Sequence, residues 1–223
     1  MTEPRVFSAD AILFDMDGTI VDSSAPVYRQ WRLWAERHDL DVPLVLRTMP
    51  GRRAAEVMEL VAPHLPQPAT LNELLLAEER DMDGIVAIPG AREFLGQLPA
   101  DRWAVVTSAT ARIAALRIAA AGLPVARVLI AAEQVSKGKP DPEGFLKAAR
   151  SLGVDPSKCL VFEDAPAGVQ AGRNAGMRVI GLTTHHSAGE LNADLCVPDF
   201  GPLTCAANGS ITVSRRPLAN AIS

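Results

Sequence analysis

Short apolar runs alternate with helix-length segments along most of the chain. The runs fit strands that are buried on both faces of a sheet, and they lie at 11–14, 103–106, 125–130, 159–162 and 179–182. The segments between them lie at 91–98, 111–121, 142–152 and 167–175. Gly122 and Gly176 follow two of these segments, where helices commonly end. The alternation predicts an α/β fold with a Rossmann-like, doubly wound parallel sheet that has helices on both faces.

The region from 23 to 88 breaks this alternation, because it contains helical patterns and no convincing strand. A first helix starts near Ser23 or Ser24, either of which can cap it, and its apolar side carries Trp31 and Trp34. Such a stripe is more often packing core than a ligand site. Two more helices are expected at about 52–62 and 71–80, with prolines as separators.

These patterns predict two domains. Residues 1–22 and 89–223 form the α/β core domain, and residues 23–88 form an all-helical cap domain inserted after the first strand. The tail beyond Gly201 is weakly patterned, and residues 211–213 are expected to add an edge strand.

Composition narrows the class of protein. The 22 basic and 26 acidic residues give a net charge of −4 without a basic block, which argues against a nucleic-acid partner. No apolar stretch has the length of a membrane helix, and the N-terminus lacks the pattern of a signal peptide. The 3 cysteines are scattered and fit neither a disulfide framework nor a zinc site. We therefore expect a cytoplasmic protein without a membrane partner.

Polar residues follow four of the predicted strands, where ligands bind in open parallel sheets. They are Asp15 and Asp17, then Thr107 and Ser108, then Lys139 across a short loop, then Glu163 and Asp164. Each group has an ordinary explanation by itself, such as a turn, a helix N-cap or a solvated lysine. Their occurrence at four strand ends in succession favours a common site.

The residue types point to phosphoryl transfer. Clustered carboxylates with few histidines suit a hard cation such as Mg²⁺, and the cation makes the close approach of Asp15 and Asp17 tolerable. An aspartate can act as a nucleophile toward phosphorus, while an ammonium and a hydroxyl stabilise the phosphoryl charge. A second acid can protonate the leaving oxygen and later activate water.

The segments DMDGTIVDS, VVTSAT, GKPDP and FEDAPAGVQAG resemble, in order, the four motifs of the haloacid dehalogenase superfamily of aspartate-nucleophile hydrolases. The resemblance covers residues 10 to about 200. It implies that Asp15 is the nucleophile and that Asp17 is the general acid/base, which also contacts Mg²⁺ through its backbone carbonyl. It implies further roles in phosphate binding for Met16, Thr107, Ser108 and Ala109, in charge balance for Lys139, and in the metal site for Asp15, Asp17, Asp164 and Glu163. The helical insert is implied to be a cap that closes over the site.

Differences from other branches of the superfamily limit the type of reaction that the resemblance implies. Dehalogenases lack the second aspartate, here Asp17, and phosphonate hydrolases need a cap lysine, which residues 23–88 do not contain. Beta-phosphoglucomutases carry a cap histidine where this chain has Val27, and they also use a cap lysine. The pattern therefore favours a phosphatase, with a phosphosugar mutase or a non-catalytic module as alternatives.

The segments PGRRAAEV, AIPGAREFL and GKPDPEGF are similar to sugar- and polyol-phosphate phosphatases of the glycerol-3-phosphatase and 2-deoxyglucose-6-phosphatase type. Pro50 stands where those enzymes often have a histidine. Arg52 and Arg53 either contact substrate or begin a solvated helix, and His185 with His186 is expected to be a surface pair. We predict a Mg²⁺-dependent phosphatase of small sugar or polyol phosphates, acting as a monomer or small homo-oligomer.

Overall fold

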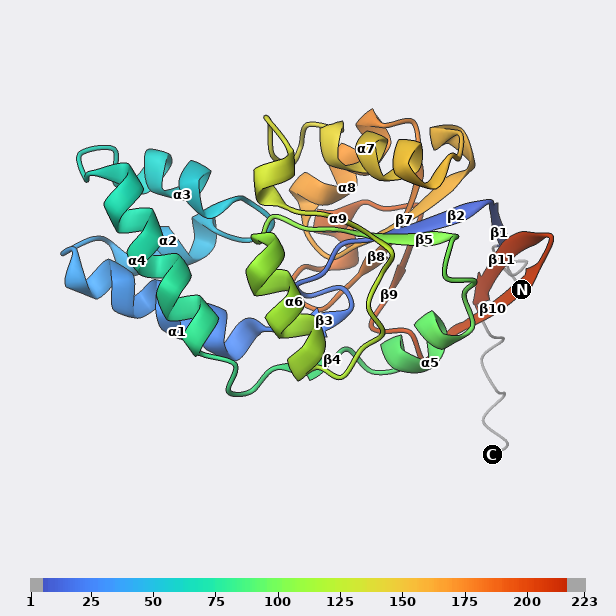
Figure 1. Cartoon of the computed structure of the whole chain (residues 1–223), viewed down its shortest axis with the longest axis horizontal. Coiled ribbons are helices and arrows are strands. Elements are labelled where there is room, and N and C mark those ends of the chain that lie inside the picture. Colours follow the sequence, from blue (N-terminus) through green and yellow to red (C-terminus); the bar gives the residue numbers. More distant parts are fainter. Residues whose placement is uncertain (1–5, 216–223) are drawn as a thin grey trace.

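The computed structural model describes residues 6–215. Residues 1–5 and 216–223, which belong to the predicted core domain, lie outside the described part. Four helices, α1 to α4, lie to one side of the molecule, and the main sheet with its covering helices makes up the other (Figure 1). Within residues 6–215, no helix combines the length and the apolar character needed to cross a membrane.

The main sheet has six strands in the order β6-β5-β2-β7-β8-β9, and all its neighbours pair in parallel. Its strands are β2 (Ala11–Phe14), β5 (Trp103–Val106), β6 (Val128–Ile130), β7 (Cys159–Glu163), β8 (Arg178–Leu182) and β9 (Leu195–Val197). Five of them match predicted runs, although β6 begins three residues later than expected. The sequence pattern missed β9, because a run of three residues is too short to stand out between polar neighbours.

Helices cover both faces of this sheet, as the alternation predicted. They are α5 (Ala91–Gly96), α6 (Ala111–Ala120), α7 (Glu143–Leu152), α8 (Pro166–Asn174) and α9 (Ala188–Leu191), with short 3₁₀ turns at Ala132–Gln134 and Pro156–Lys158. Along β2, Ile12 and Phe14 pack on the side of α5 and α6, whereas Ala11 and Leu13 pack on the side of α7 and α8. Because both faces are buried, the strand reads as a continuous apolar run.

The two glycines expected at helix ends have the predicted backbone. Gly122 follows α6 with φ of +61°, and Gly176 follows α8 with φ of +76°. Both values lie in the left-handed region that favours glycine at a helix C-terminus. Each helix therefore stops where the sequence indicates, and the chain turns back toward the sheet.

A second, antiparallel sheet corrects the expectation for the tail. It joins β1 (Val6–Ala9), β10 (Leu203–Asn208) and β11 (Ser210–Arg215) in the order β1-β11-β10. Residues 211–213 therefore lie in a strand, but this strand is the centre of a separate sheet rather than an edge. Ile211 and Val213 point with Phe7 into the main core, which explains why the hairpin packs there.

The helical segment contains one helix more than predicted. Its members, which we call the cap helices, are α1 (Ser24–Arg37), α2 (Val42–Thr48), α3 (Ala54–Val61) and α4 (Gln67–Arg80). Helix α2 was missed and α4 begins earlier than expected, because Pro43 and Pro68 were treated as separators. Both prolines lie in the first turn of a helix, where the missing N–H group costs no hydrogen bond.

A short pair of strands lies at the borders of this segment. Strands β3 (Val21–Asp22) and β4 (Val86–Ala87) form an antiparallel pair where the cap helices leave and rejoin the rest of the chain, so the region does contain a short strand.

Trp31 and Trp34 are buried in a cluster of apolar cap residues, and their ring centroids lie 5.6 Å apart. This agrees with the packing role expected for the stripe, although Trp31 also borders the cavity described below. The division into two domains stays a prediction.

Candidate active site

Asp15 stands at the carboxyl end of the central strand β2 and is buried, with 6% of its surface exposed. Its Oδ1 atom accepts a hydrogen bond from the Lys139 ammonium, which is also buried and lies 2.5 Å from Oε1 of Glu163. Burial raises the pKa of Asp15 to about 7, although Lys139 opposes this shift. Burial disfavours the charge on Lys139, but the two carboxylates outweigh it and raise the pKa of the ammonium.

Glu163 holds this arrangement in place. Its Oε2 atom accepts hydrogen bonds from the backbone N–H groups of Asp164 and Ala165, at 2.9 and 3.0 Å, and Lys139 takes the other oxygen. A Cβ atom at Gly168 would come within 1.7 Å of Glu163 Oε1, so a glycine is needed at this point of α8. Both oxygens of Glu163 are therefore engaged, so the side chain fixes Lys139 and contributes its charge to the carboxylate cluster described below.

Asp164 lies close to Asp15 and completes the group of buried carboxylates. The hydroxyl of Thr19 lies 3.3 Å from Asp15 Oδ2 and 3.5 Å from Asp164 Oδ1, which places the two carboxylates together. His185 Nδ1 lies 2.8 Å from the second oxygen of Asp164. Burial raises the pKa of Asp164, and the hydrogen bond from His185 opposes that shift. A Cβ at Gly18 would lie 2.1 Å from Asp164 Oδ2, so this close approach requires the glycine of the DGT motif.

The donor set fits a hard cation. Oxygens of Asp15, Glu163 and Asp164 lie within 4.8 Å of one another, and all three residues are buried. Lys139 supplies one positive charge against these three carboxylates, and a divalent cation would balance the remainder. The oxygen-only set suits Mg²⁺ better than zinc, which favours nitrogen and sulfur ligands.

Asp17 is oriented differently from its neighbour. Its Oδ1 atom accepts a hydrogen bond from the Ser23 hydroxyl at 2.5 Å and lies 3.0 Å from Nη1 of Arg117. The Asp17 side chain is 31% exposed and faces the space between the sheet edge and the cap helices. The carboxylate is therefore outside the cluster that could hold a cation, and only its backbone carbonyl is left for the metal contact that the sequence predicts.

The remaining predicted phosphate-binding residues line the end of β5 and the turn after β2. Thr107 is buried, and its hydroxyl oxygen accepts a hydrogen bond from the Ala109 N–H group at 3.0 Å. The Ser108 hydroxyl donates to the carbonyl of Gly51, in the turn before α3, at 3.0 Å. The side chain of Met16 is fully buried, and its carbonyl accepts hydrogen bonds from the three backbone N–H groups at 19–21.

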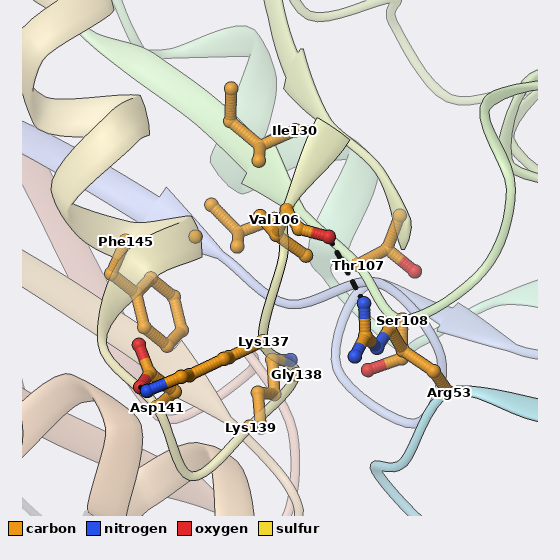
Figure 2. A pocket seen from close by; sticks show the side chains of 12 residues that line it. Arg53, Val106, Thr107, Ser108, Ile130, Lys137, Gly138, Lys139, Asp141 and Phe145 are labelled. Atoms are coloured by element: carbon orange, nitrogen blue, oxygen red, sulfur yellow. Dashed lines mark hydrogen bonds and ion pairs between the residues drawn. The ribbon is translucent and has the colours of Figure 1, made fainter. Parts of the chain in front are cut away.

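The two arginines at the cap turn differ sharply. Arg53 binds the Glu56 carboxylate, with Nε at 2.9 Å, and donates to the carbonyls of Val135 and Ser136. Figure 2 shows its guanidinium beside Thr107 and Ser108, with Lys139 nearby. The guanidinium of Arg52 makes no hydrogen bond or ion pair with residues 6–215, and it borders the large cavity described next.

A cavity of about 730 Å³ lies between the sheet edge and the cap helices. Asp15, Asp17, Thr107 and Asp164 border it on the side of the sheet. Its opposite wall contains apolar side chains, among them Val27, Tyr28, Trp31, Leu71 and Leu75, together with the charged side chains of Arg52, Arg53, Glu56, Glu59 and Glu78. Most of the predicted site residues therefore face one space that is large enough for a small organic phosphate, whereas Met16, Lys139 and Glu163 do not line it.

Two polar residues near the site were not assigned to it from the sequence. His185 lies at the surface, as expected, but it also borders the cavity, and its ring contacts Asp164 and lies 2.7 Å from the Ser24 hydroxyl. It follows β8, so a fifth strand end could have indicated it. Arg117 interrupts the apolar pattern of α6 on its buried side, next to Ile113 and Ile118. A charged residue in such a stripe signals a buried partner.

The chain matches the family model of haloacid dehalogenase-like hydrolases over residues 9–176 and belongs to this family. It is 37% identical to hexitol phosphatase A of Escherichia coli over 90% of this chain and 97% of that protein. The crystal structure of a hydrolase from Pseudomonas syringae has a TM-score of 0.77 at 27% identity, covering 85% of this chain and 94% of the other. The family assignment confirms the resemblance drawn from the four motifs.

Two yeast enzymes confirm the closer resemblance as well. The chain is 32% identical to 2-deoxyglucose-6-phosphate phosphatase 2 of Saccharomyces cerevisiae, covering 91% of this chain and 92% of that protein. It is 34% identical to glycerol-1-phosphate phosphohydrolase 2 of the same yeast, covering 82% and 78%. These relatives are phosphatases by name, and the names differ in the sugar or polyol that carries the phosphate.

Proposed function

We propose that the protein is a Mg²⁺-dependent phosphatase that hydrolyses small sugar or polyol phosphates through an aspartyl-phosphate on Asp15. The observation that carries the proposal is the position of Asp15: a buried carboxylate paired with Lys139 at the floor of a cavity of about 730 Å³. The names of the related phosphatases support the substrate class.

The first half of the reaction forms the covalent intermediate. A carboxylate oxygen of Asp15 attacks phosphorus, the bond from phosphorus to the sugar oxygen breaks, and Asp17 gives a proton to that leaving oxygen. Lys139 and the Thr107 hydroxyl balance the charge on the phosphoryl oxygens, since Lys139 contacts the Asp15 carboxylate directly and Thr107 borders the same cavity as Asp15. Asp15, Asp164 and the carbonyl of Asp17 would hold Mg²⁺, which supplies further positive charge to the same oxygens.

The second half releases phosphate. Asp17 takes a proton from a water molecule, whose oxygen attacks phosphorus and breaks the bond to Asp15. This restores both aspartates to their starting states, so the net reaction is hydrolysis of the monoester. The apolar wall around Trp31 and Leu75 limits the access of other water, and Arg52 is the group placed to contact the hydroxyls or the phosphate of the substrate.

A phosphosugar mutase is the alternative that the fold leaves open. Val27 argues against it, because an apolar side chain borders the cavity at the position where mutases of this family have a histidine. The two reactions differ in the fate of the phosphate. We expect free phosphate from hydrolysis, whereas a mutase would interconvert two sugar phosphates without release.

The test is a panel of hexitol, hexose and glycerol phosphates, assayed for phosphate release with Mg²⁺ and with chelator. We expect turnover of several members, and a loss of at least about 10⁴-fold in Asp15→Asn with the fold unchanged. Asp10→Asn, on the sheet edge away from the cavity, serves as the matched control and should keep wild-type activity. Undiminished phosphate release by Asp15→Asn would refute the covalent mechanism.

A further inference from the structure

Arg117 connects three parts of the molecule in a buried ionic chain. It lies on α6, its side chain is 5% exposed, and its guanidinium contacts two carboxylates at once. Nη1 lies 3.0 Å from Oδ1 of Asp17, and Nη2 lies 3.1 Å from Oε2 of Glu78 on the cap helix α4. Burial lowers the pKa of Arg117, but the two carboxylates outweigh this and hold it above its usual value.

We propose that Arg117 is a positioning residue that fixes the rotation of the Asp17 carboxylate, and that Glu78 holds Arg117 in place for this task. The proposal rests on the function proposed above, in which Asp17 moves protons to and from the reacting oxygens. It assigns a role to two residues that lie outside the four sequence motifs, one on a core helix and one on a cap helix.

The contacts of Asp17 define what is fixed. Two donors, the Ser23 hydroxyl and the Arg117 guanidinium, both bond to Oδ1. Oδ2 has no hydrogen bond to any residue between 6 and 215, and it is therefore the oxygen available to substrate and water. Two fixed donors on one oxygen determine where the other oxygen points, because the carboxylate is planar and rigid.

Glu78 explains why the arginine stays extended toward Asp17. A buried arginine needs partners for its charge, and Asp17 alone is partly exposed. The Glu78 side chain, only 8% exposed, supplies this second partner through the other nitrogen of the guanidinium, Nη2. Burial raises the pKa of Glu78 and Arg117 opposes that shift, so the pair is mutually dependent. Buried ion pairs often add little net stability, which makes packing alone a poor reason for this one.

The neighbouring arginine on the same helix provides a matched control. Arg112 also joins α6 to α4, through Glu79 at 2.5 Å, but its side chain is 74% exposed and it does not contact Asp17. Loss of Arg112 removes an ionic contact between the same two helices without touching the site. Arg112→Met therefore controls for the loss of an ionic contact between α4 and α6, and the comparison of two substrates described next controls for the burial of Arg117.

Two kinds of substrate separate positioning from general damage. The leaving group of p-nitrophenyl phosphate departs without a proton, whereas the alkoxide of a sugar phosphate requires one from Asp17. Hydrolysis of the aspartyl-phosphate requires Asp17 as base with either substrate. Arg117→Met should therefore phosphorylate Asp15 rapidly from p-nitrophenyl phosphate and hydrolyse the intermediate slowly.

The experiment measures rapid-mixing kinetics of wild type, Arg117→Met, Arg117→Lys, Glu78→Gln and Arg112→Met. In Arg117→Met we expect a burst of about one p-nitrophenol per enzyme, then slow turnover, and a loss of kcat on the best sugar phosphate of about 10²-fold or more. Arg117→Lys should recover part of this loss, Glu78→Gln should show the same pattern more weakly, and Arg112→Met should match wild type.

Equal losses on both substrates without a burst, in Arg117→Met or in a folded Arg117→Lys, would overturn the positioning role. So would equal effects of the Arg112 and Arg117 variants. A wild type that releases no phosphate from any substrate would instead overturn the proposed function, so the two failures are distinguishable.

Discussion

The two walls of the cavity are built in different ways. The sheet wall, by which we mean Asp15 and Asp164 together with Lys139 and Glu163 in contact with Asp15 or its partner, is buried, and Asp15, Lys139 and Glu163 each have at least two polar contacts that fix their positions. On the cap side, most of the lining is apolar, and the Arg52 guanidinium has no partner within residues 6–215. The charged groups that carry out a reaction need fixed geometry, whereas the groups that contact a variable sugar do not.

The contrast predicts which substitutions change chemistry and which change substrate preference. Substitutions of sheet-wall residues should reduce kcat for every substrate, and they should reduce the free energy of unfolding when they leave a buried charge without a partner. Substitutions of the cap wall, the lining that the cap helices and the turn before α3 contribute, should alter KM in a substrate-dependent way and leave the free energy of unfolding nearly unchanged.

Lys139→Met tests the sheet wall most severely. It leaves Asp15 and Glu163 buried without their shared cation, so we expect a loss of about 3–5 kcal/mol in the free energy of unfolding, together with loss of activity. Lys147→Met is the matched control, because Lys147 pairs with Glu143 at the surface and should cost less than about 1 kcal/mol. Urea denaturation measures the free energy of unfolding of both variants. Equal losses in the two variants would contradict the claim that Lys139 is a buried partner of Asp15 and Glu163.

Metal binding tests the same wall without an activity assay. Mg²⁺ that binds only the folded protein should raise its free energy of unfolding by about 2.7 kcal/mol at 100 times the dissociation constant. The Asp164→Asn variant should lose most of this increase, because it removes one of the clustered carboxylates. Thermal unfolding with Mg²⁺ and with chelator measures the difference. An equal Mg²⁺ effect in both proteins would place the cation elsewhere.

The two cap-turn arginines test the other wall. Arg52→Ala should raise KM by about 10- to 100-fold for sugar phosphates, because it removes a charged contact to substrate, and should leave the melting temperature unchanged. Arg53→Ala should lower the melting temperature, since Arg53 joins Glu56 to the carbonyls of Val135 and Ser136. The reverse outcome would show that Arg53, not Arg52, is the substrate contact.

The smallest expected effect concerns an ion pair at the outer side of the cap helices. Hydrogen bonds from Arg29 lower the pKa of Asp81 to about 2. The folded protein therefore gains stability above pH 3.8, the ordinary pKa, and loses this gain as the pH falls toward 2. Asp81→Asn should cost less than about 1 kcal/mol at pH 7, because Arg29 is 41% exposed. A difference that grows on acidification would contradict this account.

The sequence predicted most of the sheet wall because Asp15 and Asp164 come at the ends of apolar strands, and Lys139 follows another strand across a short loop. The parallel fold then brings distant residues such as Asp15 and Lys139 together without further information. Arg117 and Glu78 escaped notice because they lie within helices, where only the final packing of α6 against α4 determines their partners. The strands β1 and β10 escaped because their apolar positions become meaningful only after the hairpin folds back onto the core.

The central claim is that a phosphoryl group is held transiently on Asp15, and it can be tested by trapping. Asp17→Asn removes the base for the second half of the reaction, so the intermediate should accumulate when this variant is mixed with p-nitrophenyl phosphate and Mg²⁺. After acid quenching and proteolysis, mass spectrometry should place the phosphoryl group on Asp15, and the Asp15→Asn, Asp17→Asn double variant should carry none. A phosphoryl group on another residue, or phosphate release with no labelled peptide at any time, would contradict the account.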